Sequence, residues 1–148
     1  QIIEACSALS DEQLDAAPQS ATKGSIRRTL WHLVSSQQGY LSLLTGMERP
    51  SRWEAPPPLA ELEQAARVSG EGFVALARGE PGTPLKTHIQ TNDGYHVKPW
   101  VVMVQAINHA TEHREQVNSM LSALGVTPPN LDGWSYGEVT NALTPIST

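Results

Sequence analysis

The stretch from Trp100 to Leu124 has the hydrophobic pattern of one long amphipathic helix. Two histidines, His109 and His113, lie on its otherwise apolar face, one helical turn apart. Imidazoles four residues apart on a helix can bind one metal ion from the same side. The alternative is a pair of hydrogen-bonded core histidines. Residues at steps of three or four define the predicted inner face: Val102, Ala106, His109, His113, Val117, Met120 and Leu124.

A second helix is predicted over residues 26–45. Ser25 can cap its first turn, and Gly46 is a suitable residue to end it. Beside its apolar face runs a stripe of small and polar residues around His32. Two histidines alone do not make a tight metal site, so His32 is the candidate for the third ligand. The apolar face comprises Ile26, Leu30, Leu33, Leu41 and Leu44.

The remaining pattern completes an all-α fold with a small β-hairpin between the third and fourth helices. Helical faces are predicted over residues 1–9, where the first helix looks truncated, and over residues 59–78, where two glycines would permit close helix contact. Residues 85–98 favour strands around the turn Asn92-Asp93-Gly94. We expect His88 and His96 on this hairpin to be exposed and not to bind metal.

Two segments outside these elements carry aromatic residues. The proline-rich linker over residues 47–58 contains Trp53, which we expect to pack against the helices rather than to bind a ligand. After Gly125, the Pro- and Gly-rich tail contains Leu131, Trp134 and Tyr136, which we expect to fold back over one end of the helices.

Composition limits the possible partners. The chain of 148 residues favours a single domain over residues 1–148. Its net charge of −5 argues against a nucleic-acid partner, and no apolar run reaches the roughly 20 residues that span a membrane. Cys6 is the only cysteine, which excludes an intrachain disulfide and a cysteine-based zinc cage and fits a cytoplasmic protein.

Three histidines from two helices would leave a fourth metal position open, as catalytic sites do. Zinc held in this way lowers the pKa of bound water towards about 7 or receives a thiolate, and nickel also accepts imidazole. The string from His109 to His113 also matches the H-x-x-E-H motif of inverted zinc peptidases, with Glu112 as general base. The peptide-binding sheet of such enzymes is not evident, so we interpret Glu112 as a solvated charge.

Two stretches resemble a known family. They are SIRRTLWHLVSSQQGYLSLLTG, with His32, and the string N-H-x-x-x-H-R-x-Q from Asn108 to Gln116, followed by a Leu-Gly-x-x-Pro-Pro turn. Both are similar to the DinB-like superfamily, also called the DinB/YfiT-like metalloenzymes. The resemblance implies a four-helix bundle in up-down-down-up order with one long crossover. It also implies a divalent metal, zinc or nickel, on His32, His109 and His113, and frequent homodimers.

Characterised relatives include thiol S-transferases, so our first hypothesis is a metal-dependent enzyme that activates a low-molecular-weight thiol for transfer to a small-molecule substrate. The alternatives are a hydrolase that uses metal-bound hydroxide and a non-catalytic, stress-related metal-binding module. An open pocket at the metal favours an enzyme, and a basic rim favours the transferase. We expect Thr29, Ser36 and Gly39 to line the approach. The rim candidates, each alternatively a solvated charge, are Arg27, Arg28 and Arg114.

Overall fold

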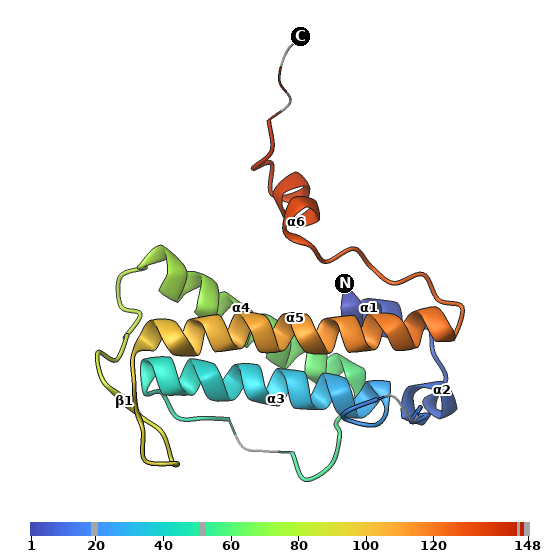
Figure 1. The fold of residues 1–148 in the computed structure, drawn as a ribbon, viewed down its shortest axis with the longest axis horizontal. Helices are drawn as coiled ribbons and strands as arrows, with labels where there is room; N and C mark the ends of the chain where they lie inside the picture. Colours follow the sequence, from blue (N-terminus) through green and yellow to red (C-terminus); the bar gives the residue numbers. More distant parts are fainter. Residues whose placement is uncertain (19–20, 51–52, 145, 147–148) are drawn as a thin grey trace.

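The computed structural model describes residues 1–18, 21–50, 53–144 and 146. Within these residues the chain forms six helices and one two-stranded antiparallel hairpin (Figure 1). The helices are α1 (Ile2–Cys6), α2 (Asp11–Asp15), α3 (Ile26–Thr45), α4 (Leu59–Arg78), α5 (Pro99–Ala123) and α6 (Gly133–Val139), and the strands are β1 (Ile89–Gln90) and β2 (His96–Val97).

The predicted bounds of α3 and α4 are confirmed, and those of α5 differ from the prediction by one residue at each end. Local signals set these bounds. The Ser25 hydroxyl oxygen accepts a hydrogen bond from the backbone N–H of Arg28 at the start of α3. Gly46 ends α3 in the left-handed region, with φ of 75°, which a residue without Cβ adopts readily. Helix α4 has the predicted bounds, and Pro99 is the first residue of α5, where its missing N–H costs nothing.

The predicted hairpin is present but its strands are short. Ile89 pairs with Val97 and Gln90 with His96, on either side of a turn that contains Gly94. Ile89 is buried and packs with Leu44 and Val102. The hairpin therefore closes one end of the helices through buried Ile89, and Val97 packs partly buried against the same cluster.

Helices α3 and α4 run parallel in close contact. The Gln37 side-chain amide donates hydrogen bonds to the Ala66 carbonyl oxygen at 2.9 Å and to the Ser69 hydroxyl oxygen at 2.8 Å. Further along both helices, a Cβ atom at Gly72 would lie 2.6 Å from a methyl carbon of Leu41. Glycine at this position therefore permits the close approach that the sequence predicted.

Helix α5 runs antiparallel to α3 (Figure 1). His113 contacts His32 near the start of α3, whereas Gln105 contacts Tyr40 near its end. These directions are those expected for the last three helices of an up-down-down-up bundle. Because α1 contains only five residues, the complete four-helix bundle stays a prediction. The homodimer also stays a prediction.

A long connection joins the parallel helices α3 and α4 and runs back beside α3 (Figure 1). Two of its residues, 51 and 52, lie outside the described part of the chain. The Arg49 guanidinium donates a hydrogen bond to the Ser35 carbonyl oxygen at 2.7 Å. Trp53 packs against the core, as predicted. The return path of the connection thus brings Trp53 to the first half of α3.

Buried apolar residues form two clusters. The hairpin cluster contains Leu44, Ile89 and Val102, and along α5 the two histidines lie between it and the larger cluster. The prediction that Leu124 faces the core is wrong, because Leu124 follows the last residue of α5 and is 36% exposed, whereas Leu121 is fully buried. The larger cluster contains Ile3, Cys6, Leu9, Leu14, Ile26, Leu30, Val34, Leu62, Val117, Met120 and Leu121.

The C-terminal segment differs from the prediction. Figure 1 shows α6 standing away from the long helices, and Trp134 and Tyr136 are 75% and 68% exposed. The Asp132 carboxylate caps this helix by accepting a hydrogen bond from the backbone N–H of Ser135 at 2.8 Å. Local capping therefore forms α6, and the two aromatic residues do not cover the end of the helices. None of the helices in the described residues is long and apolar enough to cross a membrane.

Candidate metal centre

Three imidazoles from two antiparallel helices meet between α3 and α5. His32 projects from α3, and His109 and His113 project from successive turns of α5. Their ring centroids are 4.4 to 5.0 Å apart. Within the described residues, this is the only group of three or more His, Cys, Asp or Glu side chains placed to hold a metal ion. The structure thus brings together the three histidines singled out in the sequence.

The geometry of the three side chains fits a divalent ion. Each offers one ring nitrogen, and no two of these nitrogens are more than 4.8 Å apart. The Nε2 atoms of His32 and His109 are 3.0 Å apart. A tetrahedral ion with metal–nitrogen distances near 2.0–2.1 Å holds its ligand nitrogens about 3.3 Å apart. The spacing of His32 and His109 is close to this value, and imidazole suits zinc, nickel and other divalent transition metals.

Gln116 orients the most buried of the three rings. Its side-chain oxygen lies 2.9 Å from Nδ1 of His113, which is only 4% exposed. An amide oxygen only accepts hydrogen bonds, so His113 donates through Nδ1–H, and in the neutral ring this tautomer leaves the Nε2 lone pair available to a metal ion. The sequence motif ended at Gln116 without a role for it. The signal that could have indicated this role is the position of Gln116 three residues after His113, on the same helix face.

The electrostatics of the cluster keep two of the rings neutral. Burial lowers the pKa of His32 to about 4, with further contributions from the positive charge of Lys23 and from the neighbouring histidines. Burial and His113 also lower the pKa of His109, against an opposing effect of the Glu112 carboxylate. A neutral imidazole is the form that binds a metal ion. His32 and His109 are therefore ready to act as ligands near pH 7.

Comparison with known proteins decides the family. The model of the DinB family matches residues 1–145, almost the whole chain. The chain belongs to the DinB family. No curated protein matches it in sequence. In this DinB protein the three histidines that the resemblance named lie together and could hold a metal ion.

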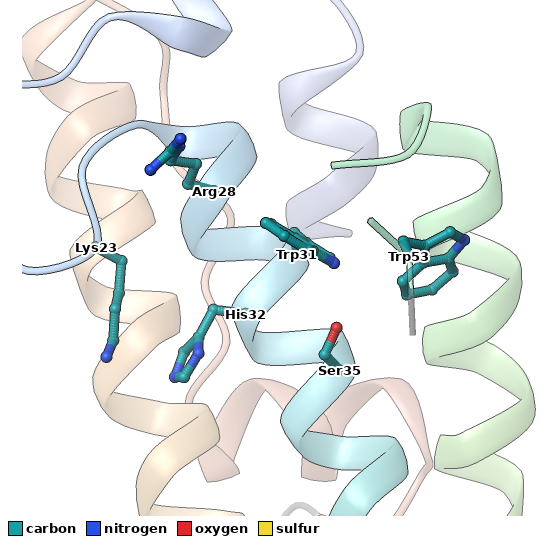
Figure 2. A pocket seen from close by; sticks show the side chains of 6 residues that line it. All are labelled: Lys23, Arg28, Trp31, His32, Ser35 and Trp53. Atoms are coloured by element: carbon teal, nitrogen blue, oxygen red, sulfur yellow. The ribbon is translucent and has the colours of Figure 1, made fainter. Parts of the chain in front are cut away.

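An open pocket of about 400 Å³ lies beside His32 in the DinB protein (Figure 2). Its floor is one face of α3, where Arg28, His32 and Ser35 follow each other at steps of four and three residues. Lys23, from the loop before α3, and Trp53, from the connection to α4, form two of its sides. The sequence did not identify this pocket because residues from three separate segments line it, and Trp31 completes the lining.

The predicted approach residues of the DinB protein have other roles. Thr29 is buried, and its hydroxyl donates a hydrogen bond to the Ser25 carbonyl oxygen at 2.9 Å. The Arg49 guanidinium covers Gly39, where a Cβ atom would lie 3.2 Å from its central carbon. Neither residue lines the pocket, nor does Ser36. Ser35, the neighbour of Ser36, does line it.

Of the three arginines considered for a basic rim, only Arg28 lines this pocket. Arg27 forms ion pairs with Asp11 and Asp15. Arg114 donates hydrogen bonds within α5, to the Ala110 carbonyl and the Thr111 hydroxyl. The sequence missed Lys23 because its place at the pocket depends on the path of the loop.

The other candidates in the DinB protein lie outside the cluster. His88 and His96 are both exposed on or beside the hairpin, as expected. Glu112 is exposed, which favours a solvated charge over the general base of a peptidase.

Replacing Gln116 by alanine is expected to weaken zinc binding roughly 10- to 100-fold, the usual cost of losing a hydrogen bond that orients a ligand. The physical reason is the loss of the acceptor that fixes the His113 tautomer. Competition with a chromogenic zinc chelator measures the change. The control is Gln90→Ala on the exposed part of the hairpin, which should bind zinc as the native protein does. Equal affinities for native protein and Gln116→Ala would contradict the assigned role.

Proposed function

We propose that this DinB protein is a metal-dependent enzyme that activates a low-molecular-weight thiol for S-transfer to a small molecule. In this proposal His32, His109 and His113 hold one divalent ion, zinc or nickel. The bound ion would favour the thiolate form of the thiol at neutral pH. A cytoplasmic setting is part of the proposal and agrees with Cys6 being a buried free thiol.

The observation that carries this proposal is the open pocket beside His32. A structural metal site is closed by its ligands, whereas a catalytic site keeps one side open for a reactant. His113 is buried at the back of the cluster, and His32 lines a pocket of about 400 Å³. A volume of this size suits a small molecule. It also argues against a purely metal-binding module, which needs no such space.

The residues around the pocket favour thiol transfer over hydrolysis. Activation of water usually relies on a nearby carboxylate or histidine base that is not occupied as a ligand. None of the described residues that line this pocket is Asp or Glu, and Glu112 is exposed. A thiol whose pKa is lowered by the bound ion would already be a thiolate near neutral pH and would need no such base. The roles of the chain's own residues are therefore to hold the ion and to orient the reactant.

Elemental analysis followed by activity assays tests the proposal. We expect about one divalent ion per chain in the purified protein and none in the variant with alanine at His32, His109 and His113. The metal-loaded protein is then assayed with a panel of small thiols and the electrophile 1-chloro-2,4-dinitrobenzene, and with ester substrates. Turnover of thiols that the triple variant lacks supports the proposal. Ester hydrolysis alone, or metal binding without any turnover, would overturn it.

A further inference from the structure

The pocket beside His32 has a cationic side formed by Lys23 and Arg28. Both side chains line it, and no carboxylate of the described residues forms an ion pair with either. The neighbouring Arg27, in contrast, is paired with Asp11 and Asp15. In a chain with net charge −5, two unpaired cations at one small pocket attract an anion there.

Lys23 also lies close to the candidate metal centre. Lys23 and His32, one of the three histidines, line the same pocket. Figure 2 shows the Lys23 side chain and the His32 imidazole extending towards the same end of the pocket. A negatively charged group held by Lys23 would therefore lie near the histidine cluster.

The opposite side of the pocket is aromatic. Trp31 and Trp53 line it from α3 and from the connection before α4, and Figure 2 shows the two indoles on the same side of α3. The indole nitrogen of Trp31 is buried and has no hydrogen-bond acceptor within the described residues. A buried donor without an acceptor costs about 1–3 kcal/mol.

From these contacts we infer that the pocket binds a small organic anion that carries a flat apolar group. Its carboxylate, phosphate or sulfonate is attracted by the positive charges of Lys23 and Arg28, whose charged ends lie towards opposite ends of the pocket (Figure 2), and its apolar part packs against Trp31 and Trp53. Arginine and lysine are the side chains that bind such anions, and indole surfaces favour flat apolar partners. Binding of the anion is independent of the proposed function. Only the further step, in which this anion is the reactant at the histidine cluster, rests on that function.

Calorimetry with a matched pair of probes tests the inference. The probes are 1-naphthoate, which carries the anion, and 1-naphthamide, its neutral counterpart. We expect the native protein to bind 1-naphthoate at least about tenfold more tightly than 1-naphthamide, since hydrogen bonds to charged groups are the stronger ones. Lys23→Gln and Arg28→Gln should each weaken 1-naphthoate binding about tenfold and leave 1-naphthamide binding unchanged.

Two further variants separate the walls of the pocket. Trp53→Leu should weaken binding of both probes by about fivefold, because it removes aromatic contact and no charge. Lys98→Gln is the matched control, since this lysine precedes α5 and is not among the residues that line the pocket. Its affinity for both probes should equal that of the native protein.

The histidine cluster could itself attract a carboxylate through a bound ion, so each titration is repeated after treatment with a chelator. Binding that survives in chelated protein and depends on Lys23 and Arg28 supports the inference, even if the proposed catalytic function fails. Binding that disappears with the metal and is unchanged in Lys23→Gln and Arg28→Gln would overturn it. Equal affinities for the acid and the amide would also overturn it.

Discussion

Replacing His113 by alanine is expected to remove the bound divalent ion from the protein. His113 is the most buried of the three histidines and is oriented by Gln116 at 2.9 Å. Loss of a residue that merely orients a ligand typically weakens metal binding 10- to 100-fold, so loss of a ligand should exceed about 100-fold. Two imidazoles would remain, one from each helix. Elemental analysis and zinc titration of the purified variant measure the effect.

Matched histidine variants make this test specific. His88→Ala and His96→Ala remove imidazoles from exposed positions on or beside the hairpin. Both should keep the metal content of the native protein. Thermal unfolding of chelator-treated samples checks that His113→Ala still folds. A folded His113→Ala protein with native metal content would refute the site, and loss of metal in either hairpin variant would show that a ligand is misassigned.

Replacing Leu30 by alanine is expected to lower the free energy of unfolding by about 2–5 kcal/mol, the usual range for a fully buried leucine. Leu30 is 0% exposed and packs within the larger core cluster, two residues before His32 on α3. Domains of this kind are stable by only about 5–15 kcal/mol, so the loss is a large share of the total. Urea denaturation of chelator-treated protein measures it without the stabilisation that a bound ion adds.

Leu85→Ala is the matched control for this core substitution. Leu85 lies before the hairpin and is 52% exposed. Removing an exposed side chain usually changes stability by no more than about 0.5 kcal/mol. A Leu30→Ala protein that is destabilised no more than Leu85→Ala would contradict the packing of α3 against the larger core cluster.

The sequence by itself determined the long helices and one pair of candidate ligands. Helix bounds follow from local signals, such as the Ser25 cap and the left-handed Gly46. His109 and His113 share a face because four residues make about one helical turn. These relations hold inside a single element, where covalent geometry sets the distances. The hairpin turn was predictable for the same reason.

The third ligand required more than a local pattern. His32 is 77 positions before His109, and no periodicity within either helix relates the two. The small and polar stripe around His32 made it the candidate, the family resemblance supported the pairing, and the antiparallel packing of α3 and α5 brings the rings within contact. The hydrophobic pattern also failed at the C-terminal end of α5, where it predicted a buried Leu124. The helix ends at Ala123, so Leu121 is buried and Leu124 is exposed.

Only the tertiary structure decided what surrounds the histidine cluster. Lys23 and Trp53 come to one pocket because the loop before α3 and the connection after it both return to the same face of that helix. Arg27 and Arg28 are neighbours in sequence, yet one is paired with carboxylates and the other lines the pocket. Loop paths and ion pairs depend on the whole chain. For that reason, local patterns together with the family resemblance predicted the candidate ligands of this DinB protein, and its fold determined which charged and aromatic side chains surround them.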